Sequence, residues 1–365
     1  IETIEGRLMQ LTWLLRVTIV FTLLVILMGA YTRLSDAGLG CPDWPGCYGH
    51  IKVPTHDHEI SHAQTLFPDH DIHPEKAWLE MIHRYIAGAL GILVLLVFIL
   101  CLKTSQAPKK LPLAIVLLII FQAALGMWTV TMKLMPIVVM SHLIGGFSLL
   151  SLLLLLYLRT RPKRIFETAD IHSQRVAGAV FNGSHGSRIG TSLKFIGQSK
   201  HLPKLALLSL LVLIGQIMLG AWTSSNYAAL ACTALPICEG NWMDNLAIAD
   251  AFSPFQGQHP SFEFGVLDYH ARMTIHIAHR VGAIITASLL LWLAYLLFFG
   301  TQLKALSLLL VALVILQVSL GISNVVMHLP LGIAVSHNGG AALLLLALVA
   351  INYFLWHKPS STSRV

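Results

Sequence analysis

Long apolar runs separated by polar segments dominate the pattern of hydrophobic and polar positions along the chain. An α-helix needs about 20 apolar residues to cross about 30 Å of hydrocarbon, and each run is near or above that length. The runs lie near residues 12–32, 77–102, 111–132, 137–158, 205–224, 270–299, 304–327 and 331–356. The pattern therefore predicts an all-α, polytopic membrane protein with eight transmembrane helices.

Composition agrees with this prediction. Of the 365 residues, 56% are hydrophobic and only 11% are charged, which excludes a soluble globular protein. The first apolar run is long enough to span and no small-residue cleavage site follows it, so we expect no cleaved signal peptide.

The net charge of +7 is a signal of membrane orientation and not of nucleic-acid binding. Lysines follow the second apolar run, and nine basic residues lie between positions 159 and 204. By contrast, the segment 224–268 contains no Lys or Arg, and 35–75 contains only Lys52. Because cytoplasmic loops of membrane proteins carry an excess of Lys and Arg, we expect both termini and the central segment to be cytoplasmic.

Four of the five cysteines lie in segments predicted to be outside. Cys41 and Cys47 form one pair and Cys232 and Cys238 the other, while Cys101 lies near a cytoplasmic helix end. Disulfides form outside the cytoplasm, so we predict two short-loop disulfides. A zinc site using all four is the competing interpretation, although the spacing is wider than that of usual zinc motifs. For the first pair we favour a loop staple over a redox or substrate-admitting role.

The chain contains an internal repeat. Gly29-Ala30-Tyr31-Thr32 matches Gly220-Ala221-Trp222-Thr223, and Gln122 to His142 matches Gln317 to His337. We expect an N-terminal four-helix half (1–158), a cytoplasmic linker (159–203) and a C-terminal four-helix half (204–365). Four is an even number, so both halves enter the membrane in the same sense, as a parallel repeat.

Histidines recur near the outer ends of the even-numbered predicted helices, at positions 83, 142, 279 and 337. Within one half, two such imidazoles on neighbouring helices could approach one flat ligand from opposite sides. A small residue follows each histidine by four positions, on the same helix face: Ala87, Gly146, Ala283 and Ala341. Iron held by two axial histidines in a bundle core is the chemistry that this pattern favours. Close packing of membrane helices through small residues is the alternative.

Charged residues flank two of these histidines. Glu80-Met81-Ile82-His83-Arg84 returns 196 positions later as His276-Ile277-Ala278-His279-Arg280, with histidine in place of glutamate. Ionisable groups inside a membrane are functional candidates by default. Arg84 and Arg280 could bind carboxylates of a cofactor or act as snorkelling anchors at the outer interface.

The remaining histidines carry less weight. His50, His56, His58, His62, His70 and His73 lie in the first outer segment beside several acids. A metal site is conceivable there, but we expect a solvated polar loop because no helical or hairpin spacing aligns them. His328 is expected to be an interfacial residue.

Taken together, these motifs resemble those of the heme A synthase family. The resemblance is carried by Gly29–Leu34, the Gly-x-Gly-Cys-Pro-Asp-Trp-Pro-Gly-Cys segment at 38–47, Glu80-x-x-His83-Arg84 and the later Ser-His and His-Arg positions. It implies two four-helix halves that oxidise the C8 methyl of heme O to a formyl group, giving heme A for terminal oxidases. It also implies a substrate site ligated by His83 and His142, and a heme b ligated by His279 and His337.

The resemblance also implies a setting. A Cys41–Cys47 bridge is similar to that of bacterial members, which places the protein in a bacterial plasma (inner) membrane. The implied partners are heme O, the heme O synthase (protohaem farnesyltransferase) that supplies it, an electron donor or acceptor, and the lipid bilayer. Self-association into a homo-oligomer stays open.

Glu80 is the residue that distinguishes the two halves. It lies one turn from His83, so its carboxylate can reach a porphyrin edge to position water, take a proton or stabilise a developing cation. We therefore predict Glu80 as the catalytic residue, with an ion pair to Arg84 as the competing role.

Two other functions compete with a synthase. A membrane cytochrome b passing electrons between quinol and an acceptor would hold two equivalent hemes and be indifferent to Glu80. A heme or small-molecule transporter would carry helices interrupted near the midplane. The prolines at 112, 136, 203 and 330 fall at predicted helix ends instead.

Overall fold

The computed structural model describes residues 4–160 and 201–357. Eight of its helices are long and apolar enough to span a membrane, as predicted. They are α1 (Ile4–Leu34), α3 (Pro74–Lys103), α4 (Lys110–Thr131), α5 (Pro136–Thr160), α7 (Leu202–Ser225), α9 (Tyr269–Gly300), α10 (Lys304–Val326) and α11 (Leu331–Trp356). The described residues form no strand, so the all-α class is confirmed. The predicted linker, 159–203, lies almost wholly outside the described residues.

Local chemistry sets several helix ends. Pro74 begins α3 and Pro136 begins α5, where the missing proline N–H would have no helical partner. Asp268 caps α9 by accepting a hydrogen bond from the Ala271 amide at 2.8 Å. The short turns α4–α5 and α10–α11 each contain two consecutive residues with positive φ, Lys133–Leu134 and His328–Leu329. The same backbone turn therefore recurs at matching places in the two predicted repeats.

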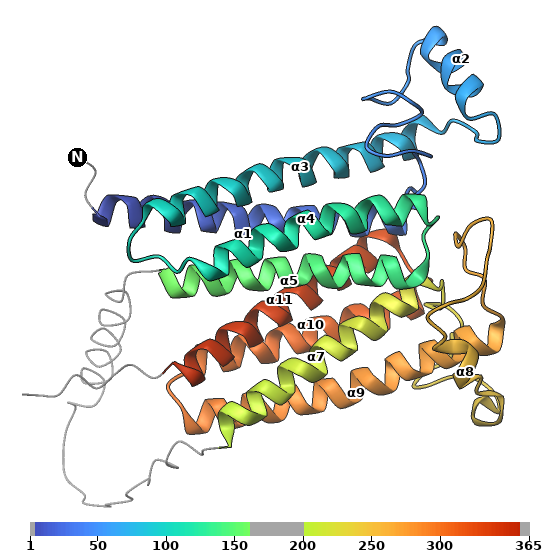
Figure 1. Ribbon diagram of the computed structural model, residues 1–365. Helices are drawn as coiled ribbons and strands as arrows, with labels where there is room; N and C mark the ends of the chain where they lie inside the picture. The colour runs from blue at the N-terminus through green and yellow to red at the C-terminus, as the bar shows by residue number, and fades with distance from the viewer. Residues whose placement is uncertain (1–3, 161–200, 358–365) are drawn as a thin grey trace, which may run out of the picture.

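The spanning helices pack as two groups of four (Figure 1). In the first group, α1 contacts α3 and α5, and α4 contacts the same two helices. In the second, α7 contacts α9 and α11, and α10 contacts the same two. The groups meet through α1, α5, α7 and α11, and an apolar cluster containing Phe147, Leu150, Leu213 and Leu348 crosses this boundary.

The long loops after α1 and α7 lie at one end of the bundle, opposite the start of α1 and the end of α11 (Figure 1). Arg33 joins the two groups at this end. Its guanidinium donates to the Tyr227 hydroxyl at 2.6 Å and to the Ser224 carbonyl at 3.3 Å. It also lies 4.3 Å from the centre of the Tyr227 ring, within cation–π range.

The loops also contain short helices: α2 (Asp57–Leu66), the 3-10 helix η1 (Trp242–Asn245) and α8 (Ile248–Ala251). The expectation that no helical spacing aligns the histidines of this loop was wrong, because His58 and His62 lie one turn apart on α2. His62 Nδ1 lies 3.4 Å from His50 Nε2. Among the described residues, none of these histidines belongs to a group of three metal-ligating side chains.

Candidate functional site

The four predicted ligand histidines lie as two pairs, one in each four-helix group. His83 on α3 and His142 on α5 are close enough for their imidazoles to interact electrostatically, and so are His279 on α9 and His337 on α11. The sequence prediction placed each pair on neighbouring helices. In the structure, α3 and α5 instead lie diagonally across the first group, as α9 and α11 do in the second, because each packs between the same two helices. Diagonal helices present their side chains from opposite sides of a bundle core.

Each imidazole packs against a glycine of an adjacent helix. A Cβ placed on Gly29 would lie 2.8 Å from His83 Cε1, and Cβ atoms on Gly126, Gly220 and Gly321 would lie 3.4, 3.1 and 3.2 Å from Cε1 of His142, His279 and His337. These contacts are at or below the limit for real side chains, most sharply at Gly29. All four glycines lie within the repeated segments, and they make room for the histidine rings.

Three of these imidazoles have a buried nitrogen without a partner. Nδ1 of His83, His142 and His337 makes no hydrogen bond within the described part of the chain. Nearly all buried polar atoms in proteins are hydrogen-bonded, and these three rings are exceptions at Nδ1. No described side chain therefore fixes their orientation through that nitrogen.

Glu80 is buried, with 5% of its surface exposed, and both carboxylate oxygens are engaged. Oε1 pairs with Arg84 Nη2 at 2.5 Å, and Oε2 accepts a hydrogen bond from the Cys41 amide at 2.9 Å. The ion pair that competed with a catalytic role is therefore present. Because the carboxylate also binds the cysteine loop, its position is fixed from two directions.

His276 occupies the corresponding place in the second group. Its Nδ1 lies 3.2 Å from the Cys232 amide, and its Nε2 lies 3.2 Å from Arg280 Nε. A neutral imidazole accepts at one nitrogen only, whereas a carboxylate accepts at both oxygens. An acid is therefore not required to hold a cysteine loop at this position.

Both predicted propionate partners contact the cysteine loops. Arg84 Nη1 donates to the carbonyls of Asp43, at 3.0 Å, and of Gly46. Arg280 donates to the Cys232 carbonyl at 2.6 Å, and to those of Ala234 and Ile237. These bonds give each arginine a structural role at the loop, and contact with a cofactor carboxylate stays a prediction.

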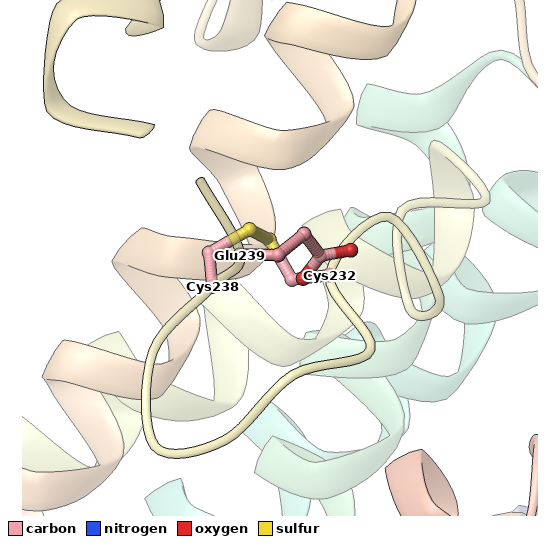
Figure 2. A group of neighbouring side chains, drawn as sticks. All are labelled: Cys232, Cys238 and Glu239. Atoms are coloured by element: carbon pink, nitrogen blue, oxygen red, sulfur yellow. A yellow bond between two sulfur atoms is a disulfide. The ribbon is translucent and has the colours of Figure 1, made fainter. Parts of the chain in front are cut away.

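The cysteines pair as predicted, Cys41 with Cys47 and Cys232 with Cys238, with S–S distances of 2.07 and 2.12 Å. Cys101 is free and buried. Figure 2 shows the second disulfide with Glu239 beside it. These three residues form the one metal-ligand cluster among the described residues, but metals bind thiolates and these sulfurs are bonded to each other. The four-cysteine zinc interpretation was wrong.

Glu239 organises the second cysteine loop. Its carboxylate accepts hydrogen bonds from the amides of Thr233, at 3.2 Å, and Ala234, at 3.1 Å. Backbone hydrogen bonds, that from Ala234 first, hold the pKa of Glu239 below its usual value.

We expect this loop to loosen in acid. A lowered folded-state pKa gives stabilisation that is complete above the unfolded pKa of about 4.3 and is lost as the pH falls through the folded pKa. Hydrogen exchange at Thr233 and Ala234, corrected for intrinsic rates, should lose protection as the pH falls below the unfolded pKa. In Glu239→Gln this pH dependence should vanish; unchanged protection of the wild type in acid would contradict the assignment.

Comparison with known proteins identifies the family. The model for the cytochrome oxidase assembly protein family matches residues 12–349. A heme A synthase of Shewanella oneidensis is 81% identical over 357 residues, covering 98% of this chain and all of that protein. The chain belongs to the heme A synthase family.

More distant heme A synthases match over much of the chain. The protein of Orientia tsutsugamushi is 24% identical over 357 residues, covering 93% of this chain and 94% of its own length. That of Shouchella clausii is 26% identical over 279 residues, covering 75% and 72%. The resemblance found in the sequence is thus confirmed, and with it a multi-pass membrane protein.

Membership of the heme A synthase family implies that heme is involved, and the residues around the two histidine pairs are suited to hold it. Each four-helix group contains one pair of histidines that approach from diagonal helices, with a glycine beside each ring. Two imidazoles on opposite sides are the donor set for a six-coordinate heme iron.

Proposed function

We propose that the chain oxidises the C8 methyl group of heme O to the formyl group of heme A. The reaction is two successive hydroxylations, after which the resulting gem-diol loses water to give the aldehyde. Each hydroxylation is a two-electron oxidation, which takes either water with a two-electron acceptor or dioxygen with a two-electron donor. Family membership supports an oxidoreductase that makes heme A. The single observation that carries the site assignment is the difference between Glu80 and His276 at otherwise equivalent places.

In this proposal the two halves have different tasks. His83 and His142 hold heme O, the substrate, in the half formed by residues 1–158. His279 and His337 hold a resident heme b in the half formed by 204–365, and when bound it supplies one-electron transfer or structural support. Arg84 and Arg280 remain candidate partners for the heme propionates, through donors not used by the loop carbonyls.

Glu80 acts on the substrate from one turn before His83. Its carboxylate can position water or accept a proton at the methyl carbon, as a general base. Hydrogen bonds from Arg84 and the Cys41 amide fix its orientation, which a catalytic group needs. The disulfide loop lies directly over this carboxylate and limits access of bulk water.

The cellular setting follows from the same proposal. The protein lies in a bacterial inner membrane with both termini in the cytoplasm, so the histidine sites are near the outer face. Heme O comes from a heme O synthase, with which direct contact is proposed, and an electron partner completes the reaction. Whether the protein acts as a homo-oligomer does not affect the site assignment.

The test is pigment analysis of the purified full-length chain after expression with a heme O source. We expect acid–acetone extraction and chromatography to recover heme A together with heme B. Heme B alone, at twice the amount per chain, would contradict the proposal and favour a cytochrome b that passes electrons between quinol and an acceptor.

A further inference from the structure

Three of the four histidines share a pair of neighbours that the fourth lacks. A glutamine precedes the ring-contacting glycine by one turn, and a second glycine follows the histidine by three positions. The sets are Gln122 with Gly145 at His142, Gln216 with Gly282 at His279, and Gln317 with Gly340 at His337. At His83 the corresponding positions are occupied by Val25 and Ile86.

The glutamines of the C-terminal half bind their histidines. Gln216 Nε2 donates to the His279 backbone carbonyl at 2.9 Å and lies 3.0 Å from Nδ1 of the same residue. Gln317 Nε2 donates to the His337 carbonyl at 3.0 Å and lies 3.4 Å from His337 Nε2, the other ring nitrogen from the one that Gln216 approaches in His279. A carboxamide carries a donor and an acceptor, so it can satisfy a ring nitrogen in either tautomer.

The second glycine makes room for each glutamine. A Cβ on Gly282 would collide with the carboxamide oxygen of Gln216, and a Cβ on Gly340 with that of Gln317. Glutamine and glycine therefore form a pair, here called the glutamine–glycine pair. Changing either residue alone would disturb the contact between the glutamine and the histidine.

The N-terminal half lacks these bonds. Val25 and Ile86 belong to the apolar cluster of the first group, so the places taken by glutamine and glycine at the other three histidines are apolar and filled at His83. At His142 the glutamine is present, but neither amide atom of Gln122 makes a hydrogen bond in the part of the chain that the structure describes. The two halves thus differ in their glutamine contacts: in the C-terminal half a glutamine donates a hydrogen bond to the backbone of each histidine, and in the N-terminal half none does within the described residues.

We propose that Gln216 and Gln317 are positioning residues that lock the axial histidines of a permanently bound heme, and that Val25 and Ile86 leave His83 free so that its site can exchange heme. This rests on the proposed function, in which the N-terminal heme is substrate and product and must leave after each cycle. Partners of metal-ligating histidines fix ring orientation, and their loss typically weakens metal affinity by about 10–100-fold.

The first experiment compares Gln216→Leu with Gln122→Leu in the heme-loaded full chain. Transfer of heme B to excess apomyoglobin should be about tenfold faster in Gln216→Leu than in the wild type. The largest g value of the low-spin ferric heme B should shift as well, because it reports imidazole orientation and not overall stability. Gln122→Leu, an equal change in the other half, should leave both heme B readouts at wild-type values.

The second experiment introduces the glutamine–glycine pair at His83 through Val25→Gln combined with Ile86→Gly. Transfer of heme A from this variant to apomyoglobin should be about tenfold slower than from the wild type. Val25→Gln alone should not slow it, since Ile86 occupies the space that the carboxamide needs.

The outcomes separate the two proposals. Heme A and heme B present at wild-type levels, with equal heme B transfer rates and g values in wild type and Gln216→Leu, would overturn the positioning role alone. A wild type that contains only heme B would overturn the proposed function, whatever the glutamine variants do.

Discussion

Replacing Glu80 with histidine is expected to stop heme A formation while both heme sites stay filled. The substitution copies the C-terminal half, where His276 faces the Cys232 amide and Arg280. An imidazole at position 80 can therefore still accept a hydrogen bond from the cysteine loop. It removes the carboxylate beside His83, and loss of a general base lowers rates by about 10²–10⁴-fold.

The measurement is the ratio of heme A to heme O in extracts of purified protein, together with heme B per chain. We expect heme O to accumulate and heme B to stay at the wild-type level. Glu80→Gln is the matched control for shape, since it keeps an acceptor oxygen but no charge, and it should also lose activity. His276→Glu, the reciprocal change, should leave heme A formation intact.

A different pattern would show that Glu80 acts only as a structural acceptor. If Glu80→His made heme A at the wild-type rate, the only role of the carboxylate would be to bind the Cys41 amide and Arg84. If the variant lost heme from both halves, the loop contact would be a requirement for folding, and Glu80→Gln would then decide the catalytic role.

The membrane architecture could be predicted because hydrocarbon imposes a length on each span. All eight apolar runs became helices, with ends shifted by a few residues except at α1, which begins at Ile4 instead of near residue 12. Both disulfides followed from the predicted topology, which puts each cysteine pair, close in sequence, on the outer side of the membrane. The amphipathic helix α2 was missed, because a ten-residue polar helix has no comparable signal.

The sequence could place the four histidines at matching positions of the two halves, but not their surroundings; binding of heme by them stays a prediction. Repetition of His83 and His279 in matching motifs indicated their importance, whereas the approach of Gly29 to the His83 ring depends on how α1 packs against α3. The contact between Glu80 and the Cys41 amide joins residues 39 positions apart and depends on the loop fold. Gly29 and Gly220 each lie against a histidine ring, which makes Val25 and Gln216, four positions earlier, equivalent in the two halves. The sequence alone does not show that this valine and this glutamine occupy equivalent places beside a ring.

Removing one axial histidine from each half should remove different hemes. In His83→Ala we expect heme O and heme A to disappear from the purified protein while heme B stays at the wild-type amount per chain. In His279→Ala we expect the reverse loss, of heme B. The physical reason is that a bis-histidine heme loses half of its protein ligands, whereas the other four-helix group keeps its own pair and its own helix contacts.

Pyridine hemochrome spectra and chromatography of each variant measure the two losses separately. External imidazole added during purification is the control, since a small ligand can replace the missing side chain and restore heme only if the rest of the site is folded. If both variants lost heme B and heme A in equal proportion, each site would depend on the other, and the assignment of substrate and resident heme to separate halves would be wrong. If His279→Ala kept a heme O site that still makes heme A, heme b would be structural, whereas accumulation of heme O in that variant would make it the electron relay that the proposed reaction needs.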